Sequence, residues 1–219
     1  MQLVETAILV AVLMLSVVVH EVAHAWQARR EGDDTAERLG RITLNPLPHL
    51  DLLGSIILPA LLAWQGGLIF GWAKPVPVNP HNYREYVAGD IRVSMAGIVS
   101  NLGLAVLATL VAGVVLKIST VVGPLAGATD LIFMTLDYAI FINLILAFFN
   151  LMPIPPLDGS HVVAHALPPG LAERYRELGR YGLFIVMGLV FFLPGVIDTM
   201  LAPVFYLRGL ADQFIRLWI

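Results

Sequence analysis

The stretch "VVVHEVAHAW", residues 17–26, places two histidines and a glutamate inside a long apolar segment. That segment covers residues 6–28, and at about 1.5 Å of rise per residue a helix of this length crosses the roughly 30 Å hydrocarbon core of a membrane. His20 lies about 13 Å of helix rise before Arg29, the first basic residue. Ionisable groups at such depth are costly and usually functional. The stretch therefore predicts a membrane-spanning helix that carries a functional site.

The composition of the chain agrees with a membrane protein. Of 219 residues, 58% are hydrophobic and 13% are charged, against about 25% charged in a typical soluble domain. The net charge is −3 and there is no basic run, so we expect no nucleic-acid partner. The absence of cysteine excludes disulfides and cysteine zinc sites. Residues 23–25 imitate a signal-peptide cleavage site, but no basic region precedes them, so we expect this segment to be retained.

The remaining apolar segments predict an all-α integral membrane fold. We expect a polytopic helix bundle with about four spanning helices, a re-entrant segment and a small membrane-associated β-hairpin. The predicted spans after 6–28 are 93–116, 131–152 and 181–200. Residues 52–70 contain Gly54, Pro59 and a Gly66-Gly67 pair, which favours a segment that enters the membrane and returns.

The chain is expected to form one domain over residues 1–219. Its core is predicted at 6–165, followed by the C-terminal span and tail at 181–219. Residues 171–180 predict a short polar helix, and the amphipathic residues 203–219 are expected to lie at the membrane interface.

The hairpin prediction rests on "KPVPVNP" (74–80), which follows "GGLIFGW" (66–72). Its prolines prevent a helix and are typical of an edge strand. Such an edge could pair with an unwound substrate by strand addition. The alternative interpretation is a rigid loop.

His20, Glu21 and His24 form the pattern HExxH. On a helix, residues i and i+4 share a face, so both imidazoles can reach one metal ion. Glu21 is offset by one residue and suits a general base that activates a zinc-bound water. A chance match is the alternative, because the pattern is short.

A third ligand has to come from elsewhere in the chain. The candidates are Asp51, His81, Asp137, Asp158, His161 and His165. We favour Asp158, because it follows an apolar helix that prolines end, and irregular backbone at membrane depth occurs only inside protein or beside a wet cavity. Asp158 as a helix N-cap is the alternative.

"HEVAH" (20–24) together with "NLMPIPPLDG" (150–159) resembles the site-2 protease family of intramembrane zinc metalloproteases. Stretches between them, "GRITLNPLPHLDLLGSIILP" (40–59), "FGWAKPVPVNP" (70–80) and "SMAGIVSN" (94–101), are similar to its compact bacterial members. The resemblance covers about residues 15–165. Within residues 1–219 we expect neither the PDZ insertion nor the nucleotide-sensing tail of larger members.

The resemblance implies that His20, His24 and Asp158 bind Zn²⁺, that Glu21 is the general base, and that peptide bonds in transmembrane segments of protein substrates are hydrolysed. It also raises a role for Asn101, and more weakly for Asn150, in holding substrate or an oxyanion. For Asn101 the alternative is helix packing. For Asn150 the alternative is a hydrogen bond to a carbonyl that Pro153 or Pro155 leaves without its helical partner.

Two other functions stay open at this point. One is another kind of membrane metallopeptidase, whose third-ligand glutamate motif is not found here. The other is a membrane metal transporter, which would need polar residues along several spans.

The orientation in the membrane follows from the shared metal site. The segments containing His20 and Asp158 must run in the same direction, so 52–70 cannot be a full crossing. Loops 29–51, 73–92 and 153–180 then lie on one side and carry most of the Lys and Arg residues. The positive-inside rule makes that side cytoplasmic, in the cell membrane.

Overall fold

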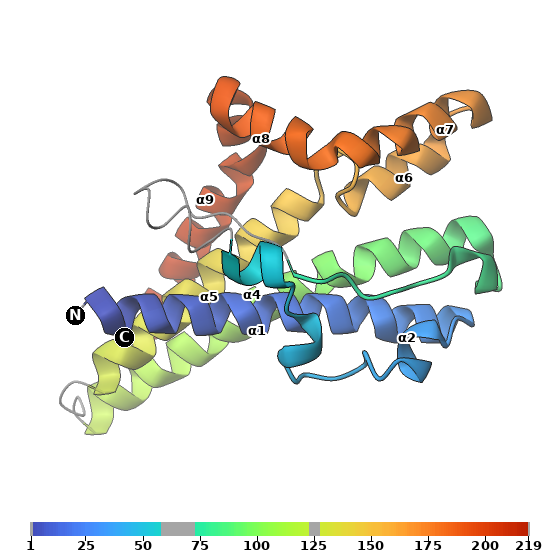
Figure 1. The fold of residues 1–219 in the computed structure, drawn as a ribbon. Helices are drawn as coiled ribbons and strands as arrows, with labels where there is room; N and C mark the ends of the chain where they lie inside the picture. The colour runs from blue at the N-terminus through green and yellow to red at the C-terminus, as the bar shows by residue number, and fades with distance from the viewer. Residues whose placement is uncertain (1, 58–72, 123–127, 219) are drawn as a thin grey trace. The chain divides into compact units, whose positions relative to one another are not determined.

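The computed structural model describes residues 2–57, 73–122 and 128–218, and it forms two compact units. One unit contains residues 1–16 and 98–219, the other residues 17–97. Within the described residues the regular structure is helical and no strand occurs. The elements, of which Figure 1 labels the α-helices, are α1 (Gln2–Glu31), α2 (Thr35–Arg38), η1 (Leu47–His49), η2 (Leu52–Ile57), η3 (Pro80–Asn82), α4 (Tyr86–Val122), α5 (Ala128–Asn150), α6 (Gly159–Ala166), α7 (Pro169–Glu177), η4 (Leu178–Tyr181), α8 (Gly182–Phe192) and α9 (Pro194–Arg216).

Three of these helices are long and apolar enough to cross a membrane, namely α1, α4 and α5. Helices α1 and α4 contain the predicted spans 6–28 and 93–116, and α5 contains all but the last two residues of 131–152, so these three predictions are confirmed as helices. Many of their large apolar side chains are exposed, among them Leu13, Leu15 and Val106. Exposed apolar surface on this scale fits contact with lipid. The all-α membrane class is therefore confirmed.

The predicted fourth span, residues 181–200, is wrong as a single helix. The chain breaks at Leu193, and α8 contains only 11 residues. Pro194 has no amide hydrogen, and its ring disfavours the helical conformation for the residue before it. A new helix, α9, starts at this proline.

The hairpin and the re-entrant segment lie partly on residues 58–72, which are outside the described residues. The described arm of the hairpin, residues 73–79, has no regular secondary structure. At the beginning of the predicted re-entrant segment, residues 52–57 form η2, a short π-helix.

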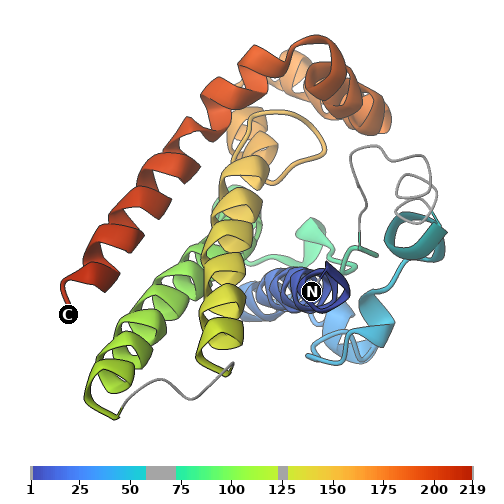
Figure 2. The ribbon, with the colours of Figure 1, turned by 90° about the vertical axis from the view of Figure 1, so that its left-hand side faces the viewer.

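The unit with residues 98–219 has an apolar core shared by three helices. Ala105 and Ala108 of α4, Ile140 and Leu144 of α5, and Val204 of α9 form one buried cluster. Helices α5 and α9, coloured yellow and red in Figure 2, pack against each other. Since Leu207, Ala211 and Ile215 pack against this cluster, the apolar side of the tail is partly buried on α4 and α5. The prediction from the sequence, that residues 203–219 lie at the membrane interface, does not account for this packing.

The unit with residues 17–97 is built on the second half of α1. At Gly32 the backbone adopts a φ of +118°, and the chain turns back. The turn lays α2 beside the end of α1, as Figure 1 shows, and Ala36 packs against Ala25. The first turns of α4 are fixed to α1 by Arg92, which donates to both carboxylate oxygens of Glu31 at 2.8 and 2.7 Å.

Candidate metal centre

The two histidines of HExxH lie one turn apart on α1, and their side chains converge. Nε2 of His20 and Nε2 of His24 are 3.0 Å apart, and both side chains are buried. Two nitrogen lone pairs at this distance repel each other unless a proton or a cation lies between them. Two ligands of a tetrahedral zinc ion, each about 2.0–2.1 Å from the metal, are themselves about 3.3 Å apart. The pair therefore fits a zinc ion.

The backbone of α4 fixes the tautomer of His24. Nδ1 of His24 lies 2.7 Å from the carbonyl oxygen of Val93 and can only donate to it. In the neutral imidazole this leaves the lone pair on Nε2, the nitrogen that faces His20. A carbonyl or carboxylate on the far nitrogen is the usual support of a metal-binding histidine.

A glycine keeps the space in front of the histidines open. A Cβ atom at Gly97 of α4 would lie 2.5 Å from Nε2 of His24 and 2.6 Å from Nε2 of His20. A Cβ atom and a nitrogen that are not bonded to each other do not come this close in proteins. Only glycine at residue 97 therefore allows both imidazoles to keep their present positions.

Glu21 lies between the histidines in sequence and is held by a separate segment. The backbone N–H of Val76 donates to Oε2 of Glu21 at 2.7 Å. A hydrogen bond of this kind limits the rotation of the carboxylate. Neither Val76, Val93 nor Gly97 was identified as a site residue from the sequence, because only the tertiary structure brings them to α1.

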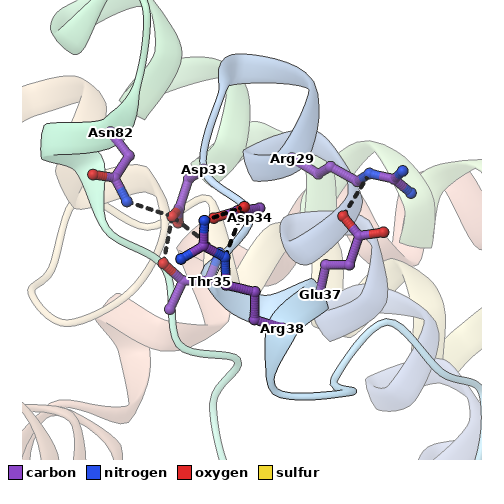
Figure 3. A network of polar contacts seen from close by, with 7 residues as sticks. All are labelled: Arg29, Asp33, Asp34, Thr35, Glu37, Arg38 and Asn82. Atoms are coloured by element: carbon purple, nitrogen blue, oxygen red, sulfur yellow. Dashed lines mark hydrogen bonds and ion pairs between the residues drawn. The ribbon is translucent and has the colours of Figure 1, made fainter.

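Asp33 organises the turn after α1 (Figure 3). Its buried carboxylate accepts hydrogen bonds from the hydroxyl and the N–H of Thr35, from Nδ2 of Asn82 and from the N–H of Asn79. Burial raises the pKa of a carboxyl group, but these four hydrogen bonds outweigh it and hold the pKa of Asp33 below its usual range.

Asp158 belongs to the other unit, where it directly precedes α6. Its side chain makes no capping hydrogen bond to α6, so the N-cap interpretation has no support. A Cβ atom at Gly159 would clash with the carbonyl of Leu151, so the turn after α5 is in close contact with the start of α6. This packing fixes the backbone that carries Asp158.

Three of the other candidate third ligands contact residues that are not part of the HExxH pattern. Asp137 accepts two hydrogen bonds from Arg208 of α9, both at 2.8 Å. Asp51 accepts from the N–H of Gly54 at 2.7 Å. The ring of His81 stacks on Tyr86. His161 and His165 lie on α6, after Asp158.

Asn101 is fully buried in a polar network. Its Nδ2 donates to Oδ1 of Asn143 at 2.7 Å and to the carbonyl of Ser16 at 3.3 Å. Asn143 in turn donates to the hydroxyl of Ser16 at 2.9 Å. These contacts support the packing interpretation of Asn101. Asn150 donates to the carbonyl of Leu146 in its own helix. This carbonyl lies seven residues before Pro153, too far to be one that the proline frees, so the second interpretation of Asn150 is not confirmed.

Comparison with known proteins decides the family. The sequence model of peptidase family M50 matches residues 52–193. A proposed zinc metalloprotease of Bacillus subtilis (strain 168), YwhC, is 39% identical over 186 residues, covering 85% of this chain and 80% of that protein. This chain belongs to peptidase family M50. The family is that of the site-2 proteases, so the resemblance seen in the sequence is confirmed.

Mycobacterial relatives agree with this assignment. A proposed zinc metalloprotease named Rip2 from Mycolicibacterium smegmatis (strain ATCC 700084 / mc(2)155) is 30% identical, covering 84% of this chain and 66% of that protein. The protein of the same name from Mycobacterium tuberculosis (strain ATCC 35801 / TMC 107 / Erdman) is 32% identical, covering 88% of this chain and 69% of that protein. No solved structure matches the chain. Together with the three apolar helices, membership of M50 makes the chain a multi-pass membrane zinc metalloprotease with Zn²⁺ as its cofactor.

Proposed function

We propose that His20, His24 and Asp158 hold the zinc ion and that Glu21 is the general base of peptide hydrolysis. The observation that carries the proposal is the convergence of the two Nε2 atoms, 3.0 Å apart. The carboxylate of Glu21, the next residue after His20, is oriented by a backbone N–H. Asp158 supplies an anionic oxygen ligand, and its side chain is not used to cap α6. Three protein ligands leave one position of a tetrahedral zinc ion open for chemistry.

The proton transfers are assigned to Glu21. Bound zinc supplies a Lewis acid that polarises the scissile carbonyl and makes a water molecule more acidic. Glu21 takes a proton from the attacking water molecule while the oxygen of that water bonds to the carbonyl carbon. Because Val76 holds Oε2, we assign this proton to Oε1. When the C–N bond breaks, Glu21 gives the proton to the leaving amine nitrogen.

The substrates are transmembrane segments of membrane proteins. This proposal is supported by the depth of the histidines in α1, a helix long and apolar enough to cross a bilayer. A peptide bond that reaches such a site has to be inside or near the hydrocarbon region. The excess of Lys and Arg in loops 29–51, 73–92 and 153–180 supports a site that opens to the cytoplasmic side of the cell membrane.

The zinc content of purified variants tests the ligand set. We expect His20→Ala and Asp158→Ala to lose zinc and activity, because each leaves only two protein ligands. Asp51→Ala is the matched control, because the carboxylate of Asp51 accepts a hydrogen bond from the N–H of Gly54. This variant should keep the wild-type zinc content. Full, tight zinc binding by the Asp158 variant would show that the third ligand is another residue.

A further inference from the structure

Segment 73–79, which has no regular secondary structure, is anchored at its start by Arg41 and His49. Arg41 donates from Nη2 to the carbonyl oxygens of Lys74 and Pro75 at 2.9 and 3.3 Å. The N–H of Lys74 donates to the carbonyl of His49 at 2.8 Å. The side chains of Arg41 and His49 are both buried, so water does not compete strongly for these contacts.

The end of the same segment is anchored by Asp33. Oδ2 of Asp33 accepts from the N–H of Asn79 at 2.7 Å, and Oδ1 accepts from Nδ2 of Asn82 at 2.8 Å. Figure 3 shows the side chains of Thr35 and Asn82 directed at this carboxylate. Asp33 is fully buried, and its short link to α1 through Gly32 ties the end of the segment to the helix that carries Glu21.

Val76 lies between these two anchors and supplies the contact with Glu21. Pro75 and Pro77 flank it, and proline has no amide hydrogen. The N–H of Val76 is therefore the one backbone donor of the stretch 75–77, and it is the group bonded to Oε2 of Glu21. A shift of the segment at either end would move this donor away from the carboxylate.

We propose that Asp33 and Arg41 are positioning residues for Glu21, acting through segment 73–79 and the N–H of Val76. The proposal rests on the assignment of Glu21 as general base. Neither side chain touches the histidines in the described contacts; each acts on the carboxylate through the backbone. A misplacement of about 1 Å at a reacting group can cost about a hundredfold in rate.

Asp33→Asn tests the end of the segment. The side chain keeps its size, but its NH2 group replaces one acceptor oxygen and faces a donor. We expect kcat for cleavage of a transmembrane substrate to fall about tenfold to a hundredfold, with KM and zinc content unchanged. Asp34→Asn is the matched control, because the side chain of the adjacent Asp34 forms an exposed ion pair with Arg38. This variant should keep the wild-type kcat.

Arg41→Ala tests the start of the segment, and Arg41→Lys tests rescue. The alanine variant should show the same fall in kcat at constant KM. Lysine can still donate to the carbonyls of Lys74 or Pro75 and should restore part of the rate. Arg38→Ala, which removes an exposed arginine of the same region, should have no effect on kcat. Hydrogen exchange of the intact protein in detergent should be faster at residues 73–79 in both Asp33→Asn and Arg41→Ala.

The outcomes separate this proposal from the assignment of Glu21. If Glu21→Gln retained the wild-type rate, the assignment itself would fail. If Glu21→Gln is inactive but Asp33→Asn and Arg41→Ala keep the wild-type kcat, the positioning role is wrong. A rise in KM at constant kcat would overturn it as well, because the segment would then serve substrate binding. Loss of zinc in both variants would show a purely structural role.

Discussion

The carbonyl oxygen of Val93 on α4 lies 2.7 Å from Nδ1 of His24 on α1, although 69 residues separate them in sequence. The contact sets which nitrogen of His24 carries its hydrogen. It also sets the register between the two helices at the height of the histidines. Gly97, one turn further along α4, then lies against both imidazoles.

Gly97→Ala should abolish zinc binding. The added methyl group would overlap with both imidazoles, so the two Nε2 atoms cannot keep their positions. Gly103→Ala is the matched control on the same helix, because a Cβ atom there meets nothing within 4 Å. Zinc per chain, measured on both purified proteins, should be near zero for Gly97→Ala and at the wild-type value for Gly103→Ala. Equal zinc contents would contradict the arrangement of α1 and α4.

The buried amides should matter for stability. Asn101→Ala and Asn143→Ala each leave partners unpaired in the same network, and we expect either to cost about 1–3 kcal/mol of unfolding free energy. The double variant should cost less than the sum, since the two side chains share a hydrogen bond. Asn150→Ala loses only a bond within its own helix and should cost less.

Thermal unfolding in detergent measures these differences. If Asn101→Ala left the unfolding temperature unchanged but reduced the rate of cleavage, the packing interpretation would be wrong. Asn101 would then have the substrate or oxyanion role that the family resemblance suggests.

The sequence predicted the parts of the site that lie within one helix. His20, Glu21 and His24 could be placed on α1 because the i, i+4 spacing fixes their common face. Apolar length was sufficient to predict α1, α4 and α5. Membership of the site-2 protease family followed from two motifs that lie far apart in the chain.

The parts that depend on tertiary contacts could not be predicted in this way. Val76 and Glu21 are 55 residues apart, and nothing local marks their hydrogen bond. The break at Leu193 was missed because an apolar run on both sides of Pro194 suggested one span. The amphipathic pattern of residues 203–219 predicts a helix at the membrane interface, and it does not show the packing of α9 on α4 and α5, which are distant in sequence.

Asp33 should make stability depend on pH in acid. Its pKa is lowered in the folded protein, so its contribution is fully present above the unfolded value of about 3.9 and is lost as the pH falls through the lower, folded value. The wild type should therefore unfold at a higher temperature than Asp33→Asn near neutral pH, and this difference should shrink below about pH 4. Asp34→Asn should show no comparable pH-dependent difference. A difference that stays constant down to pH 3 would contradict the role of the ionised carboxylate.

The orientation in the membrane can be tested with single cysteines, since the chain has none of its own. Cysteines are introduced at Thr35, Asn82 and Thr129, and an impermeant thiol reagent is added to intact cells. Only the cysteine at residue 129 should be labelled, because loops 29–51 and 73–92 are proposed to face the cytoplasm. Labelling at residue 82 but not at 35 would mean that 52–70 crosses the membrane, and the shared metal site would be wrong.

Glu21→Gln tests the central claim most directly. The substitution removes the general base but leaves His20, His24 and Asp158 in place. Zinc content and cleavage of a transmembrane substrate should be measured on the same preparation, with Glu37→Gln, an exposed glutamate paired with Arg29, as the control. We predict wild-type zinc with no detectable cleavage for Glu21→Gln, and wild-type zinc with full cleavage for the control. Cleavage by Glu21→Gln within about tenfold of the wild-type rate, a loss of under about 1.4 kcal/mol in transition-state stabilisation, would contradict the assignment.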